Sequence, residues 1–164
     1  MKCSMCDNDK ILKKETIATH RYKECGLENV ILHGITSYKC KKCGEHYLSF
    51  GDIEQLHNMI ATALTRKASV LKGKEIRFLR KHLGYSAAVF AKLVGYENEH
   101  LSRIENDKNA VQEVFDRLVR MLVMEKLPDR KYDLQDLFLE GKFMSLDWLE
   151  FSLAKKGWKS QAAA

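Results

Sequence analysis

Four cysteines stand in two Cys-x-x-Cys pairs, Cys3 with Cys6 and Cys40 with Cys43. Zinc prefers four tetrahedral ligands, and each Cys-x-x-Cys turn can present two thiolate sulfurs to one point. The spacing therefore predicts one structural zinc ion per chain. A catalytic zinc is not expected, because four thiolates leave no open position for water.

Other interpretations of the cysteines are weaker. Two unrelated reduced pairs would need no metal, but paired Cys-x-x-Cys is among the more specific short signals. A thiol redox site would be expected between a strand and a helix of a βαβ unit, and no such unit surrounds Cys3 at the N-terminus. The odd cysteine, Cys25, is interpreted as a small apolar turn residue.

A second region with candidate functional residues lies in the middle of the chain. Helical periodicity is clear from Ile76 onward, and Ser86 is placed to N-cap a second helix. Gly95 would supply the turn before a third helix, which Leu101 and Ile104 would anchor inward. The pattern predicts a helix-turn-helix.

The outer face of that third helix carries polar side chains suited to reading DNA. In the major groove, arginine can pair with guanine, asparagine with adenine, and glutamate with the amino group of cytosine. The candidates for base contact are Asn98, Glu99 and Arg103. The candidates for phosphate contact are Ser86, Lys92, His100, Ser102 and Lys108. An ordinary helical bundle with polar exposed residues is the alternative.

The rest of the sequence supplies elements that would position these sites. The predicted order is a zinc-binding module (1–51), a helical connector (52–73), a helix-turn-helix domain (74–127) and an apolar C-terminal extension (128–164). The module should contain strands near 16–22 and 29–38. The extension is too apolar to leave in water, and we expect it to be helical, with a segment for dimerisation or for binding a protein partner as the alternative. The expected fold class is α+β.

Composition agrees with a folded protein that binds polyanions. The 164 residues are 45% hydrophobic and carry a net charge of +6, with a pI near 9.0. No apolar run approaches the roughly 20 residues that span a bilayer, and the N-terminus lacks the apolar core of a signal peptide. We therefore expect a cytoplasmic protein with no membrane partner. No catalytic arrangement of nucleophile and base is evident, so we do not expect an enzyme.

Residues 86–106 resemble the Cro/C1-type (XRE) helix-turn-helix family, most closely in Leu-Ser-Arg-Ile-Glu-Asn at 101–106. The resemblance implies a lambda repressor-like fold. Two positions depart from the family pattern. Ala87 stands where members often carry a phosphate-contacting glutamine, and Asp107 stands where glycine usually follows Glu-Asn. Aspartate also accepts turn conformations.

The order of Met-Lys-Cys-x-x-Cys, Cys-x-x-Cys-Gly, helical connector and XRE domain resembles the MqsA-type (YgiT-type zinc finger) antitoxin and regulator family over roughly residues 1–125. The resemblance implies that the paired cysteines bind zinc and that Glu99 and Arg103 occupy base-reading positions. It also implies a homodimer on a palindromic double-stranded operator and, in true antitoxins, neutralisation of a ribonuclease toxin. Glu99 replaces the expected asparagine, so the operator sequence cannot be transferred.

The residues predict a sequence-specific transcriptional repressor, and the family resemblance implies in addition the antitoxin role of a type II toxin-antitoxin pair. The first alternative is a protein-interaction adaptor that no longer reads DNA, which Ala87 and the acidic Glu97 and Glu99 would favour. The second, weaker alternative is a Cys-x-x-Cys thiol redox sensor.

Overall fold

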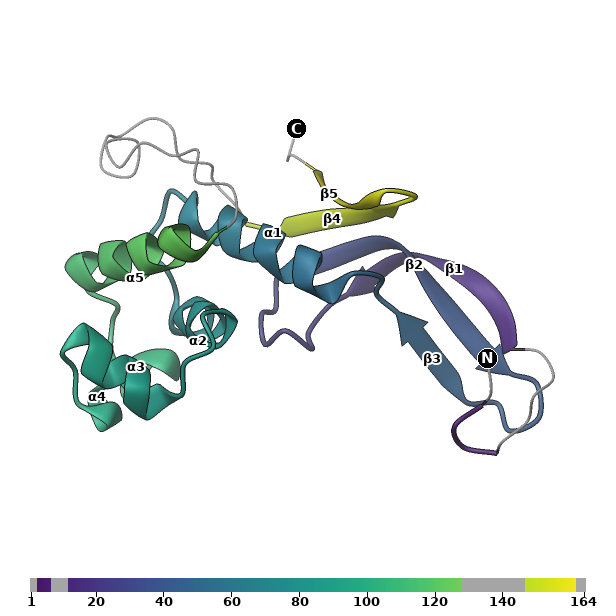
Figure 1. Cartoon of the computed structure of the whole chain (residues 1–164), viewed down its shortest axis with the longest axis horizontal. Helices are drawn as coiled ribbons and strands as arrows, with labels where there is room; N and C mark the ends of the chain where they lie inside the picture. Colours follow the sequence, from purple (N-terminus) through teal and green to yellow (C-terminus); the bar gives the residue numbers. More distant parts are fainter. Residues whose placement is uncertain (1–2, 7–11, 128–146, 162–164) are drawn as a thin grey trace. The chain divides into compact units, whose positions relative to one another are not determined.

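A computed structural model describes residues 3–6, 12–127 and 147–161. The chain divides into two compact units. Figure 1 shows their helices and strands, coloured by position in the sequence. We call them the sheet unit (1–22, 29–56 and 148–164) and the helical unit (23–28 and 57–147). None of the helices in the described residues is long and apolar enough to cross a membrane.

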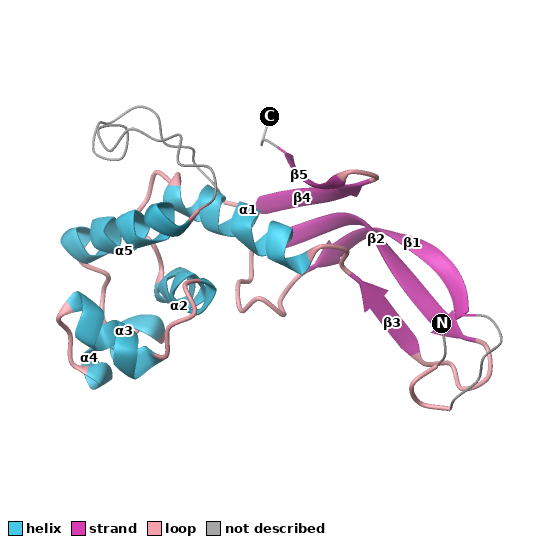
Figure 2. Ribbon diagram, in the orientation of Figure 1, coloured by secondary structure: helices cyan, strands magenta, loops and turns pink. Residues whose placement is uncertain are grey.

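The sheet unit is built on a mixed five-stranded sheet (Figure 2). Its strands are β1 (Leu12–Arg21), β2 (Val30–Cys40), β3 (His46–Ser49), β4 (Leu149–Ala154) and β5 (Gly157–Gln161). β1 pairs antiparallel with one edge of β2 along almost its whole length. The strand order is β1-β2-β4-β5, with β3 also paired to β2. The two strands predicted from the N-terminal sequence are therefore present and longer than expected.

The second edge of β2 is shared by two strands. β4 runs parallel to β2 over Val30–His33, and β3 runs antiparallel to it over Thr36–Lys39. Gly34 lies between these stretches with φ of 73°, a conformation that residues with a side chain rarely adopt. A Cβ at Gly34 would also lie 3.4 Å from the carbonyl oxygen of Leu153. Glycine therefore suits the point where β2 changes neighbours.

The prediction of a helical C-terminal extension is wrong for its described residues, which form the β4–β5 hairpin. Leu149 and Phe151 are buried directly opposite Val30 and Leu32 of β2. Trp158 is buried as well; its backbone N–H donates to Gln55 Oε1 at 2.8 Å and its indole N–H to the Phe50 carbonyl at 3.0 Å. Burying each such side chain contributes about 1.5–3 kcal/mol. The hairpin is thus part of the sheet-unit core, and residues 128–146 lie outside the described residues.

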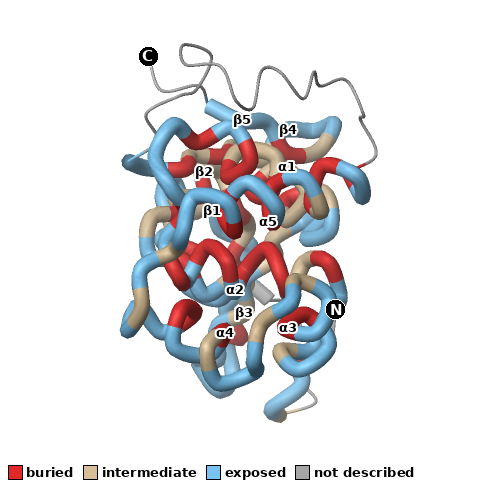
Figure 3. Tube along the Cα trace, turned by 90° about the vertical axis from the view of Figure 1, so that its left-hand side faces the viewer, coloured by how far each residue is buried: buried red, intermediate tan, exposed pale blue. Residues whose placement is uncertain are grey.

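The helical unit contains most of α1 and four further helices. They are α1 (Ile53–Thr65), α2 (Gly73–His82), α3 (Ala87–Val94), α4 (Asn98–Glu105) and α5 (Glu113–Lys126). Figure 3 shows buried residues, in red, interspersed with exposed ones along the helices. Leu101 and Ile104, which were predicted to face inward, are fully buried, and so are Ile60, Ile76, Leu79 and Val119. The periodic segments predicted as helices are therefore confirmed as helices.

A buried ion pair connects α2 to α4, and hydrogen bonds of a buried arginine connect α5 to the loop between α1 and α2. Arg80 of α2 pairs with Glu105 of α4, and both side chains are less than 10% exposed. Arg120 of α5 donates to the carbonyls of Thr65, Lys67 and Ser69 at 3.2, 2.6 and 2.8 Å. These contacts hold the end of α1 and the following loop against α5.

Candidate metal centre and nucleic-acid interface

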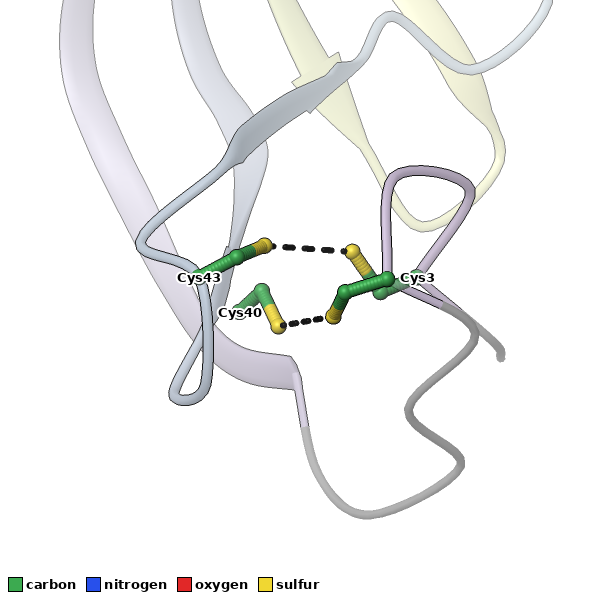
Figure 4. A group of neighbouring side chains, drawn as sticks. Cys3, Cys40 and Cys43 are labelled. Atoms are coloured by element: carbon green, nitrogen blue, oxygen red, sulfur yellow. Dashed lines mark hydrogen bonds between the residues drawn. The ribbon is translucent and has the colours of Figure 1, made fainter.

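The four paired cysteines converge at one end of the sheet unit. Their sulfurs all lie within 4.8 Å of one another. The Cys3 and Cys43 sulfurs, which face each other in Figure 4, lie 3.6 Å apart. The Cys6 and Cys40 sulfurs lie 3.7 Å apart. In the second pair, the Gly44 N–H donates to the Cys40 carbonyl at 3.0 Å. Gly44 has φ of 78°, so glycine at this position allows the tight turn.

The distances between the sulfurs of this cluster agree with those of a tetrahedral zinc site. Four sulfurs at the usual Zn–S distance in a tetrahedron lie about 3.8 Å apart. Two of the sulfur pairs, at 3.6 and 3.7 Å, are near that value. An all-sulfur donor set also suits zinc. The four residues therefore fit a single zinc ion, and Cys25, in the helical unit, is not part of the cluster.

Hydrogen bonding and crowding separate the pKa values of the clustered thiols. The hydrogen bond to Tyr47 is the main cause that lowers the pKa of Cys3 to about 6. Backbone N–H groups of Cys43 and Lys42 lower the pKa of Cys40. A backbone hydrogen bond at Glu45 lowers the pKa of Cys43, but desolvation and the neighbouring thiols outweigh it and raise that pKa to about 12. The cluster thus retains protons that a bound metal would displace.

Tyr47 is a neighbour of this cluster that the sequence analysis missed. Its phenol oxygen lies 3.1 Å from the Cys3 sulfur and 3.0 Å from the Ser4 hydroxyl. Tyr47 is on β3, directly opposite Tyr38 on β2. The turn at Gly44 was the available signal, because it returns the chain antiparallel to β2 and brings residue 47 back beside the cysteines.

The candidate nucleic-acid interface is formed by α3, α4 and the turn between them. The Ser86 hydroxyl accepts a hydrogen bond from the Val89 N–H at 3.3 Å, so the predicted N-cap of α3 is present. Gly95 ends α3 in the left-handed conformation with φ of 75°. α4 then begins at Asn98. The chain therefore has two short helices joined by a tight turn at the predicted position.

The side chains of α4 divide into two faces. Leu101, Ile104 and Glu105 are buried. The three candidates for base contact, Asn98, Glu99 and Arg103, are exposed. The candidates for phosphate contact are exposed at Ser86, Lys92, Ser102 and Lys108, whereas His100 is half-buried, with its ring 4.8 Å from that of Tyr96. His100 is thus the least accessible of the eight candidates.

Two contacts beneath α4, both missed from the sequence, fix its position. The guanidinium of Arg80 donates to both oxygens of Glu105, at 2.5 and 2.9 Å. After α4, Asp107 has φ of 57° and its carboxylate accepts the Gly73 N–H at 2.9 Å. A Cβ at Gly73 would lie 2.0 Å from the Ile104 carbonyl oxygen. Asp107 therefore takes the turn conformation expected of the usual glycine and adds a bond to the start of α2.

Comparison with known families identifies a match that covers most of the chain. Residues 1–134 match the model of a family described as the antitoxin component of bacterial toxin-antitoxin systems, MqsA. No curated protein and no solved structure matches the chain. The matched region contains the cysteine cluster and α1–α5, and it ends before the β4–β5 hairpin.

Proposed function

Because the chain belongs to the MqsA family of antitoxin components, we propose that it is a zinc-stabilised antitoxin that represses transcription by binding a palindromic operator as a homodimer. The observation that carries this proposal is the division of α4 into a buried face and an exposed, polar face. Within a helix-turn-helix, α4 would be the recognition helix. The cysteine cluster would hold one structural zinc ion.

In this proposal the metal cross-links the sheet unit and takes no part in a reaction. Zinc bound by Cys3, Cys6, Cys40 and Cys43 would join the N-terminal turn to the end of β2. Four thiolates fill its tetrahedral coordination. Binding of protein partners would therefore depend on the surfaces that the metal supports.

On DNA, some exposed residues in and around α4 would contact bases and others would contact phosphates. Arg103 can donate two hydrogen bonds to a guanine, Asn98 can pair with adenine, and Glu99 can accept from cytosine. Lys92, Ser102 and Lys108 would contact phosphates, which give affinity that depends on salt but carry little sequence information. A carboxylate at Glu99 would disfavour operators that present only acceptors at that position.

We predict that Arg103→Ala weakens binding to the operator by about 5-fold or more, because a lost bidentate base contact costs roughly 1–3 kcal/mol. Binding would be measured by fluorescence anisotropy with DNA from upstream of the gene. Arg66→Ala is the matched control, since Arg66 is an exposed arginine outside α3 and α4 and its loss removes the same charge. The Arg66→Ala variant should bind the operator with an affinity close to that of the wild type.

The competing adaptor hypothesis gives a different result in the same titrations. If binding is weak, indifferent to sequence, and equally affected by Arg103→Ala and Arg66→Ala, α4 does not read DNA. The salt dependence provides a second measurement: Lys92→Ala should reduce the slope of log K against log salt by about one, with affinity falling equally on all sequences.

A homodimer is part of the proposal, and α5 offers an apolar face for it. Val114, Leu118 and Met121 are 80%, 36% and 39% exposed. Their spacing of four and three residues places them on one side of the helix. A two-fold pair of such faces would be self-complementary and would give the operator a second recognition helix, about one helical turn away.

We predict that Leu118→Glu converts the dimer to a monomer, because it would place two carboxylates in the apolar interface. Light scattering after size-exclusion chromatography would report the mass. The operator affinity should also fall, because a monomer contacts only one half-site of the operator. Val70→Glu is the control, because Val70 is 44% exposed and lies outside α5. A monomeric wild-type protein, or a Leu118→Glu variant that stays dimeric, would reject this interface.

The family also supports a toxin as the second partner, and we propose a ribonuclease toxin. Co-expression of the chain with a candidate toxin gene from the same operon should restore growth that the toxin alone arrests. A pull-down of purified proteins would establish direct contact. If growth is restored without contact, repression rather than neutralisation accounts for it.

A further inference from the structure

We infer that Tyr47 is a positioning residue of the metal centre: its phenol donates a hydrogen bond to the Cys3 thiolate and retains that ligand on the zinc ion. The inference rests on the proposed zinc site and goes beyond it by assigning a role to a residue that is not a ligand. It is carried by the two contacts of the phenol oxygen, at 3.1 Å to the Cys3 sulfur and 3.0 Å to the Ser4 hydroxyl.

The direction of these hydrogen bonds follows from the state of the ligand. A metal-bound thiolate has no proton, so in the Tyr47–Cys3 contact only the phenol can donate. The remaining acceptor capacity of the Tyr47 oxygen can then take the proton of the Ser4 hydroxyl. The order is Ser4 O–H to Tyr47, and Tyr47 O–H to the Cys3 sulfur. Each bond in such a chain polarises and strengthens the next.

The position of Tyr47 explains why its effect should fall on Cys3. Cys3 is fully buried although it is the third residue of the chain. Tyr47 is held on β3, which pairs with the part of β2 that leads to Cys40. The phenol therefore connects the N-terminal cysteine turn to the strand that carries the second turn. It keeps the Cys3 sulfur near the metal when a Zn–S bond opens.

The charge of the loaded site gives a second reason for this hydrogen bond. Four thiolates around one divalent cation leave a net charge of −2, and hydrogen-bond donors to sulfur stabilise that excess. Charge-assisted hydrogen bonds are about twice as strong as neutral ones. Loss of a group that supports a metal ligand typically costs about 10–100-fold in metal affinity. Removing a single hydroxyl at Tyr47 should therefore be measurable.

The test compares Tyr47→Phe with Tyr38→Phe in the full-length protein. Both changes remove one phenol oxygen from directly opposed strand positions, but of these two tyrosines it is Tyr47 whose phenol lies at hydrogen-bond distance from the Cys3 sulfur. Zinc content is measured first by elemental analysis. Zinc transfer to a coloured chelator is then timed. We expect release about 10-fold faster from Tyr47→Phe and a rate close to wild type for Tyr38→Phe.

Cobalt substitution gives a readout that a merely structural role would not change. Loss of a hydrogen bond raises the energy of the sulfur lone pairs, so the sulfur-to-cobalt charge-transfer band of Tyr47→Phe should move to lower energy. Ser4→Ala should move it less in the same direction. An unmoved band, or a release rate matching that of Tyr38→Phe, would overturn the inference. Wild-type protein without stoichiometric zinc would instead reject the zinc site itself.

Discussion

Removing the metal is expected to unfold the cysteine end of the sheet unit and to leave α2–α5 folded. Structural zinc typically contributes roughly 10–16 kcal/mol of apparent binding free energy at neutral pH. Apart from the strand pairing, the described residues of the cysteine end offer little apolar packing, because Lys39, Cys43, His46 and Leu48 are all exposed. The opposite end of the sheet instead buries Leu32, Leu149, Phe151 and Trp158. The metal should therefore stabilise one half of this unit.

Cys40→Ser tests this expectation without a chelator. The variant should lose its zinc, and the amide hydrogens of β3 (His46–Ser49) should exchange rapidly, while the helical circular dichroism signal is kept. Cys25→Ser is the matched control and should retain one zinc per chain. A Cys40→Ser protein with stoichiometric zinc, or with protected β3 amides, would contradict the expectation. Wild-type protein with no metal and one reactive thiol would favour the redox hypothesis.

The metal should also be lost as the pH falls. In the bound state all four sulfurs are thiolates, so binding requires removal of any proton that the metal-free cluster holds. The pKa of Cys43 is raised to about 12 without metal, whereas that of Cys3 is lowered to about 6. Zinc affinity should therefore decline with acidification throughout the neutral range, and more steeply once the pH falls below about 6, where Cys3 also takes up a proton.

The second large effect is expected from Glu105→Gln in the helical unit. Glu105 and Arg80 are 3% and 6% exposed, and Arg80 also donates to the Tyr85 carbonyl at 2.8 Å. Breaking a buried ion pair by removing one charge typically costs about 3–5 kcal/mol, because the other charge stays buried. The free energy of unfolding, followed in urea by helical circular dichroism, should fall by about that amount.

Two further variants separate the ion pair from other effects. Glu113→Gln breaks the exposed Glu113–Arg117 pair of α5, and a pair of this kind contributes below about 0.5 kcal/mol. Replacing Arg80 by Met together with Glu105 by Leu removes both buried charges and should recover most of the loss. If Glu105→Gln costs no more than Glu113→Gln, the ion pair does not hold α4. Operator affinity should follow the loss of stability, although Glu105 faces away from the exposed side of α4.

The parts of the fold that depend on local sequence were predictable. Ser86 and Gly95 mark the start and end of α3 through their own chemistry, and Leu101 and Ile104 fix the buried face of α4 by their spacing. The cysteine cluster was predictable as well, because two short turns each supply half of a donor set. The helices are marked by residues within a few positions of one another, and the metal site is marked by one residue type at a strict spacing.

The C-terminal strands could not be placed in the same way. Leu149, Phe151 and Leu153 alternate with polar residues, which is a strand pattern, but their partner β2 is far away in the sequence. Tyr47 and Glu105 share this difficulty. Their roles come from contacts with Cys3 and Arg80, and nothing in the local sequence marks a tyrosine or a glutamate as the one that such residues will meet. Pairings of this kind are decided by tertiary structure.

The parallel pairing of β4 with β2 also sets an order of events during synthesis. Val30 leaves the ribosome long before Leu149, its partner in the sheet, because 149 − 30 = 119 residues separate them. At about 5–20 residues per second, that interval lasts roughly 6–24 s. The helices α2–α5 lie within residues 73–126, and α2 contacts both α4 and α5, so these helices can pack before the hairpin exists. The helices α2–α5 can thus fold first. The sheet that contains β2 is completed last, when β4 and β5 have been synthesised and β4 pairs with the free edge of β2.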